Sequence, residues 1–194
     1  MSDPVFDIHH ELIESGIAGS RQAQFKLYSL YCRAMYNTAL RILNSREDAE
    51  EALQDAFTEA FMKLATFRYE STFGTWLKRI VVNKSINLLR KRKIEWINDD
   101  SIGGLATEEE NGTDQESVQL DVKRIVNAME QLPDGFRLVF SLYMLEGYDH
   151  NEISGILGIS ESTSKSQLHR AKNKIREMLL IESNHTQNGR VHQE

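Results

Sequence analysis

Residues 146–175, EGYDHNEISGILGISESTSKSQLHRAKNKI, decide the fold of the C-terminal part of this chain. The stretch reads as two short helices separated by Gly158, which permits a tight turn. Apolar residues recur at helical spacing on one face of each helix, and the second helix is rich in Lys, Arg, Ser and His. Such a pair is either a helix-turn-helix that reads DNA or an ordinary helical hairpin with a basic outer face. Periodicity alone favours neither.

The outer face of the second helix carries the side chains that a helix-turn-helix would turn toward DNA. Lysine and arginine contact guanine in the major groove, and serine and histidine add hydrogen bonds. Phosphates would be held by Lys172 and by the helix N-terminus. The predicted DNA-binding residues on this face are Lys165, Ser166, His169, Arg170 and Lys172.

The charge of the chain is unevenly distributed. The net charge of −6 argues weakly against a nucleic-acid-binding protein. However, residues 67–93 hold eight basic residues against one acid, residues 94–121 hold nine acids and no Lys or Arg, and residues 161–177 hold five basic residues against two acids. Blocks of charge are often only solvated faces, but this alternation favours two basic nucleic-acid-binding segments separated by an acidic strip.

The sequence contains none of the usual motifs for catalysis or metal binding. Cys32 is the only cysteine, which excludes an internal disulfide and agrees with a reducing cytoplasm. We find no apolar run of about 18 residues and no secretory-signal pattern, so we expect a cytoplasmic protein that is not inserted in a membrane. No Gly-rich phosphate loop, cysteine pair or zinc-binding histidine pair occurs. We therefore predict no enzyme activity, catalytic residue, metal, cofactor or small-molecule substrate.

Apolar periodicity is helical throughout, so we predict an all-α fold of two small helical domains joined by a flexible acidic linker, the C-terminal domain being a helix-turn-helix. Ser45 is expected to cap a helix, Asp149 and Glu152 to form a capping box, and Ser160 to cap the last helix. Residues 136–145 are predicted as one buried helix. The predicted boundaries are an N-terminal extension at 1–18, a first domain at 19–94, the linker at 95–118, a second domain at 119–181 and a disordered tail at 182–194.

Three segments together resemble a known family. GYDHNEISGILGISESTSKSQLHRAK is similar to the last helix-turn-helix of bacterial RNA polymerase sigma factors of the extracytoplasmic-function type (sigma-70 family, group 4). SREDAEEALQDAFTEAF resembles their polymerase-docking helix, and STFGTWLKRIVVNKSINLLRKRK resembles the segment that opens and reads the minus-ten element. The resemblance covers roughly residues 20–180. It departs at Ser164, whose hydroxyl can bond to the carbonyl four residues earlier, and at Gln167, which removes a phosphate contact where arginine is frequent.

The resemblance implies roles for three sets of residues. The helix-turn-helix face named above would read the minus-thirty-five element. The minus-ten element would be bound by Tyr69, Ser71, Thr72, Lys78, Arg79, Asn83, Lys84 and Arg90, and core polymerase by Asp48, Glu51, Gln54, Asp55 and Phe57. Two of these assignments have alternatives: Asn83 is either a base reader or a satisfied polar group of the core, and Tyr69 either stacks on a base or packs on Trp76.

The implied partners are core RNA polymerase, promoter DNA as duplex and as single-stranded non-template strand, and an anti-sigma factor. The acidic linker would thread toward the channel for nascent RNA. An alternative is a free-standing helix-turn-helix regulator that acts without sigma activity, usually as a symmetric dimer. The basic, aromatic segment at 67–93 has no use in such a regulator. A helical adaptor or anti-sigma partner is disfavoured by the two basic segments.

Overall fold

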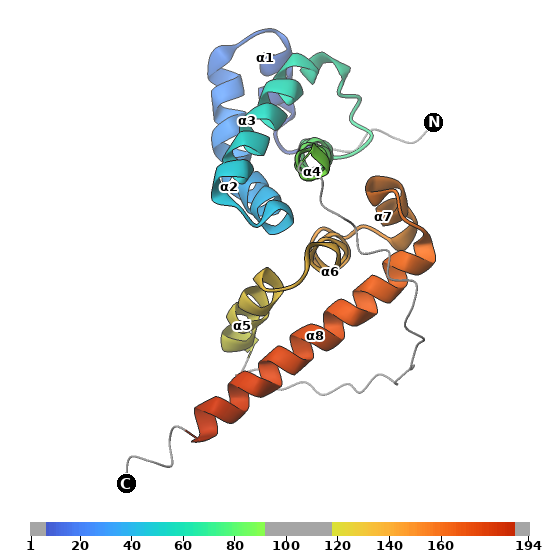
Figure 1. Cartoon of the computed structure of the whole chain (residues 1–194). Helices are drawn as coiled ribbons and strands as arrows, with labels where there is room; N and C mark the ends of the chain where they lie inside the picture. The colour runs from blue at the N-terminus through green and yellow to red at the C-terminus, as the bar shows by residue number, and fades with distance from the viewer. Residues whose placement is uncertain (1–6, 92–117, 189–194) are drawn as a thin grey trace. The chain divides into compact units, whose positions relative to one another are not determined.

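The computed structural model describes residues 7–91 and 118–188 of the chain (Figure 1). Every regular element in these two ranges is a helix, which confirms the predicted all-α class. The chain divides into two compact units, residues 1–94 and 95–194. The predicted acidic linker lies outside the described residues as far as residue 117.

The first unit is built on three long helices that pack against one another, with a short N-terminal helix added to them. In chain order its elements are α1 (His10–Ile17), α2 (Arg21–Leu43), α3 (Arg46–Met62), the 3-10 helix η1 (Leu64–Thr66) and α4 (Phe73–Lys91) (Figure 1). Helix α1 lies within the predicted N-terminal extension and packs on α2 and η1. The described part of that extension therefore belongs to the body of the unit.

Helix α3 packs on both α2 and α4, and one of its faces is made of small side chains. Four alanines recur at helical spacing and are at most 2% exposed: Ala49, Ala52, Ala56 and Ala60. Small residues let two helix backbones approach closely, so α3 can contact both neighbours. The capping signals agree with this placement, since Ser45 Oγ accepts a hydrogen bond from the backbone N–H of Asp48 as predicted.

The second unit is organised along one long helix. Its elements are α5 (Val118–Glu130), α6 (Asp134–Phe140), the π-helix η2 (Ser141–Leu145), α7 (His150–Leu157) and α8 (Glu161–Asn188). Helices α5, α6 and α7 all pack on α8 (Figure 1). Helix α8 continues past residue 181, where the disordered tail was predicted to begin; residues 189–194 of that tail lie outside the described part.

The prediction of one buried helix over residues 136–145 was wrong in its second half. Leu138 and Leu142 are fully buried, but Tyr143, Met144 and Leu145 are exposed. At Ser141 the helix widens into a π turn, in which the N–H of Glu146 bonds to the carbonyl of Ser141. A π turn has more residues than an α turn, and this rotates the following side chains off the buried face.

Candidate nucleic-acid interface

Local hydrogen bonds fix both ends of α7 and the start of α8, as the sequence predicts. Asp149 accepts a bond of 2.7 Å from the N–H of Glu152, whose carboxylate accepts one of 3.0 Å from the N–H of Asp149. Gly158 ends α7 at φ 72°, a conformation that favours glycine. Ser160 Oγ accepts a bond of 3.0 Å from the N–H of Thr163. These caps set where the two helices of the helix-turn-helix begin and end.

The first turns of α8 bring the predicted DNA-binding residues onto one face. Lys165, Ser166, His169 and Lys172 are exposed, and Arg170 is half-buried. The opposite face is buried in the unit through Leu168, Ala171 and Ile175. The packing of α8 therefore leaves a polar, cationic outer face available to a partner.

Several side chains on this outer face bond to their own helix. Lys165 Nζ lies 2.6 Å from Glu161 Oε1, and Ser166 Oγ donates to the carbonyl of Thr163. His169 Nε2 lies 3.0 Å from the side-chain nitrogen of Asn173. Such bonds between exposed groups are weak, so a phosphate or base edge can replace them at little cost.

Both departures from the sigma pattern point inward. Ser164 is fully buried, and its Oγ lies 2.9 Å from Nδ1 of His150 on α7. The predicted bond back along the helix is thus replaced by a contact between the two helices. Gln167 is only 4% exposed and lies beside Gly135 at the start of α6. We predicted that Gln167 costs a phosphate contact, but its burial means that it affects packing instead.

In the first unit, α4 turns its predicted minus-ten residues away from the core. Phe73, Leu77 and Val81 are fully buried. The predicted minus-ten residues of this helix are exposed at Arg79, Asn83 and Arg90, and half-buried at Lys78 and Lys84. Because Asn83 is exposed, it is not the buried polar group that was the alternative to a base reader.

The loop between η1 and α4 borders a pocket of about 260 Å³. Its lining combines aromatic rings with hydroxyl, carboxylate and guanidinium groups: Thr66, Phe67, Arg68, Glu70, Ser71, Trp76 and Arg79. A flat aromatic wall beside hydrogen-bonding groups suits an unstacked nucleic-acid base. Of the predicted minus-ten residues, Ser71 and Arg79 line this pocket.

Tyr69 and Thr72 have other contacts. Tyr69 adopts φ 56°, and its hydroxyl donates a bond of 2.7 Å to Glu14. Its ring lies 4.7 Å from that of Phe67, and Phe67 in turn contacts Trp76 at 5.3 Å, so Tyr69 reaches Trp76 only through Phe67. Thr72 Oγ1 accepts a bond from the N–H of Thr75 in the first turn of α4.

The predicted polymerase-binding set divides into exposed and buried members. Glu51, Gln54 and Asp55 are exposed on α3. Asp48 and Phe57 are only 4% and 3% exposed, which corrects their assignment to a surface that contacts polymerase. The ring of Phe57 packs 4.8 Å from that of Tyr28 on α2, so it belongs to the core between these helices.

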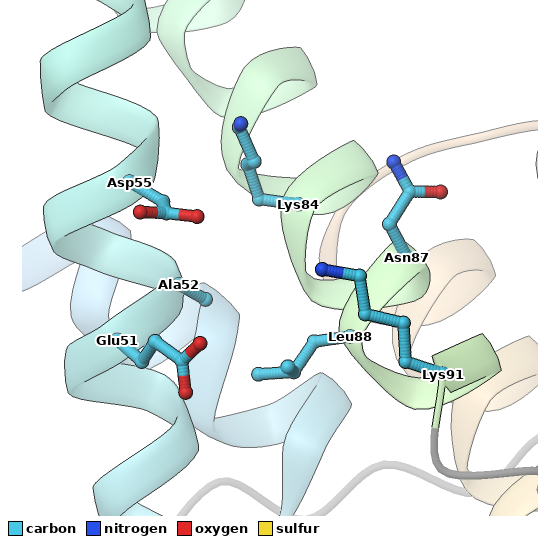
Figure 2. Close-up of a pocket in the computed structure, with 7 residues that line it drawn as sticks. All are labelled: Glu51, Ala52, Asp55, Lys84, Asn87, Leu88 and Lys91. Carbon is cyan, nitrogen blue, oxygen red and sulfur yellow. The ribbon is translucent and has the colours of Figure 1, made fainter.

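The acidic face of α3 and the basic face of α4 share a groove of about 340 Å³. Figure 2 shows its lining: Glu51, Ala52 and Asp55 from α3, and Lys84, Asn87, Leu88 and Lys91 from α4. Beside it, Glu59 accepts from Lys63 at 2.7 Å and from Lys84 at 2.8 Å. These bonds lower the pKa of Glu59, and the bond to Glu59 raises the pKa of Lys84. The predicted polymerase-binding and DNA-binding residues are therefore neighbours here.

Sequence reasoning missed several residues of these sites. Arg68, Glu70 and Trp76 line the loop pocket, and their closeness in sequence to Tyr69, Ser71 and Thr72 was a usable signal. Glu59 is held to Lys84 across two helices, and a charge pair of this kind leaves no signal in periodicity.

Among the helices at residues 7–91 and 118–188, none combines the length and the hydrophobicity that a membrane-spanning helix requires. The same ranges contain no group of three or more His, Cys, Asp or Glu side chains that could hold a metal ion.

Two family profiles match this chain. Sigma-70 region 2 matches residues 27–94, and sigma-70 region 4 matches residues 123–175. The first match includes α3 and α4, and the second includes the helix-turn-helix. The two candidate interfaces thus fall within separate sigma-70 regions.

Similar curated proteins cover most of the chain. The ECF RNA polymerase sigma factor SigM of Bacillus subtilis is 31% identical over 153 residues, which span 78% of this chain and 91% of that protein. The ECF RNA polymerase sigma factor SigM of Mycobacterium tuberculosis is 30% identical over 170 residues, spanning 87% of this chain and 83% of that protein. The likeness therefore extends over both units.

Solved structures with the same fold include two sigma-factor complexes. One holds the sigma factor RpoE with the anti-sigma factor NepR from Bartonella quintana; the TM-score is 0.52 at 24% identity, covering 80% of this chain and 96% of that chain. The other holds CnrH with the cytosolic domain of CnrY, with a TM-score of 0.51 at 23% identity, covering 87% of this chain and 94% of that chain. At these identities the likeness is one of fold.

Proposed function

Since this chain belongs to the extracytoplasmic-function group of the sigma-70 family, and so directs promoter-specific initiation by RNA polymerase, we propose that its two units divide promoter recognition. The first unit reads and opens the minus-ten element, and the second reads the minus-thirty-five element. One observation carries this proposal: each unit exposes cationic and hydrogen-bonding side chains on a helix whose opposite face is buried. Arg79 and Asn83 do so on α4, and Lys165 and His169 on α8.

The second unit reads duplex DNA with the N-terminal turns of α8. Lys165, Ser166, His169 and Arg170 face the base edges, and Lys172 with the helix N-terminus holds phosphates. Burial of the opposite face supports this orientation, because it fixes which side of α8 a partner can reach.

The first unit captures a base of the single-stranded non-template strand in the loop pocket. Trp76 and Phe67 supply aromatic surface, and Ser71, Arg68 and Glu70 supply hydrogen-bonding groups. Asn83 reads a neighbouring base, and the cations of α4 hold phosphates. Unstacking a base costs a few kcal/mol, and contacts in the pocket and with polymerase offset that cost.

Core polymerase docks on the exposed face of α3 through Glu51, Gln54 and Asp55. Carboxylates on an exposed helix face repel DNA and suit a basic protein surface instead. An anti-sigma protein binds this chain and holds it inactive; the complexes of RpoE with NepR and of CnrH with CnrY support the binding by analogy of fold. The chain supplies recognition and melting in the cytoplasm, where polymerase performs the chemistry.

Run-off transcription with purified core polymerase on a library of promoter fragments tests this function. Polymerase alone is expected to give no discrete start sites, and addition of the protein is expected to give defined transcripts. Tight duplex binding without any transcript would instead favour a free-standing helix-turn-helix regulator.

A further inference from the structure

Asp7 joins the start of α1 to the start of α4. Its carboxylate is only 4% exposed and accepts two hydrogen bonds. Oδ1 accepts from the N–H of His9 at 2.8 Å, and Oδ2 accepts from the N–H of Phe73 at 2.7 Å. Phe73 begins α4 directly after the loop at residues 67–72. Asp7 therefore holds the C-terminal end of this loop from a position 66 residues away in the chain.

Glu14 holds the middle of the same loop. Its Oε1 accepts the 2.7 Å hydrogen bond from the Tyr69 hydroxyl, and the ring of His10 lies 4.8 Å from the ring of Tyr69. Tyr69 is in the left-handed region at φ 56°, which a tyrosine adopts only where surrounding contacts hold it. Burial and the bond to Glu14 raise the pKa of Tyr69, so the hydroxyl keeps its proton and remains a donor.

Helix α1 is itself firmly seated, so it can act as an anchor. Ile13 is fully buried, and the side-chain amide of Gln24 donates to the carbonyl of Gly16. A Cβ at Gly16 would lie 3.0 Å from Leu64, which shows how closely α1 approaches η1. The loop is thus held at two points by a segment that is fixed to the rest of the unit.

We propose that Asp7 and Glu14 are positioning residues that hold the loop at residues 67–72 in the shape that receives a single-stranded base. This inference rests on the proposed function of the first unit. Tyr69 turns toward α1, while its neighbours Arg68, Glu70 and Ser71 line the pocket. Anchoring Tyr69 therefore orients the flanking side chains toward the pocket that receives the base. In this way α1 contributes to promoter opening without touching DNA.

The test uses full-length protein bound to core polymerase and a single-stranded oligonucleotide that carries the minus-ten non-template strand of a transcribed promoter. Each position of the oligonucleotide is replaced in turn by an abasic site. Glu14→Ala removes the acceptor of the Tyr69 hydroxyl, Glu14→Gln keeps an acceptor oxygen, and Tyr69→Phe removes the donor. Glu11→Ala is the matched control, because Glu11 is an exposed acid on the same helix. Thermal unfolding of each variant checks that the unit still folds.

We expect Glu14→Ala to reduce the affinity ratio between the intact and the abasic oligonucleotide at one position by about two- to tenfold, as loss of one hydrogen bond predicts. Tyr69→Phe should reproduce this loss, the double variant should add nothing, and Glu14→Gln should restore most of the ratio. Asp7→Ala should act in the same direction where the protein remains folded.

Two results would overturn the inference: unchanged discrimination at every position in Glu14→Ala, or equal weakening of intact and abasic oligonucleotides, which marks a merely structural role. Failure of the wild-type protein to confer start-site selection would be different, since it would refute the proposed function itself.

Discussion

Lys84 of α4 and Glu59 of α3 form an ion pair, with Nζ 2.8 Å from Oε2, beside the groove that separates the two helices. Both side chains are about 30% exposed, and Lys63 binds the other carboxylate oxygen of Glu59. A lysine proposed to hold a DNA phosphate is therefore already held by an acid of its own unit.

Glu59→Gln should strengthen promoter binding, because it releases Lys84 from its internal partner. One additional phosphate contact steepens the salt dependence of affinity by about one unit in the log–log slope. Titration of holoenzyme with promoter DNA between low and high salt measures this slope. Glu47→Gln is the control, since Glu47 is an exposed acid on the same helix. An equal gain in both variants would mean that only net charge matters.

The ion pair also predicts how stability depends on pH. Folding lowers the pKa of Glu59. The ionised carboxylate therefore adds to the free energy of unfolding above the ordinary pKa of glutamate, and this stabilisation is lost as pH falls through the lowered value. The pKa of Lys84 is raised, so the stabilisation by its ammonium group persists until pH rises through that higher value. The unfolding free energies of wild type and Glu59→Gln should differ by no more than about 1 kcal/mol near neutral pH. This difference should shrink in acid; one that grows in acid contradicts the assignment.

Phe57 and Gln54 should behave oppositely although both lie on α3. Phe57→Ala empties part of the core between α2 and α3 and should lower the free energy of unfolding by about 3–5 kcal/mol. Gln54→Ala should leave stability within about 0.5 kcal/mol but weaken association with core polymerase. Urea unfolding and a polymerase pull-down separate the two effects. A stable Phe57→Ala protein would show that the side chain is not buried in solution.

The Ser164–His150 contact should couple the two helices of the helix-turn-helix. Ser164→Ala and His150→Ala are each expected to cost about 0.5–1.5 kcal/mol, with the double variant losing less than the sum. Chemical unfolding of the four proteins gives this cycle, and Ser166→Ala serves as the exposed-serine control. If the two stability losses add exactly in the double variant, the Ser164–His150 contact does not help to hold α7 on α8.

Lys165→Ala and Arg170→Ala should each weaken binding to the minus-thirty-five element without affecting polymerase association. A lost base contact costs about 1–3 kcal/mol and relaxes sequence preference, whereas a lost phosphate contact mainly flattens the salt slope. Lys26→Ala is the control, since this exposed lysine lies on α2 of the other unit. Loss of polymerase association in the α8 variants would contradict the proposed division of labour.

Local signals predicted the helices well. Ser45, the Asp149 and Glu152 pair and Gly158 all act as expected, because a helix end is settled by hydrogen bonds between residues a few positions apart. The polar outer face of α8 was likewise predictable, because its apolar residues recur at the helical period. The π turn at Ser141 was not, since nothing in the apolar pattern of residues 136–145 marks a change in hydrogen-bond register.

The sequence by itself determined most of the helical elements, their caps, the two basic segments and the sigma-70 family, since these depend on residue types at short, regular spacings. Tertiary structure alone decided that Phe57 and Gln167 are buried, that Tyr69 turns toward Glu14, and that Asp7 caps α4. The last two bonds join residues 55 and 66 positions apart, and such pairings follow only from how the helices pack. Periodicity shows which face of a helix is apolar, but packing chooses the neighbour that each side chain meets.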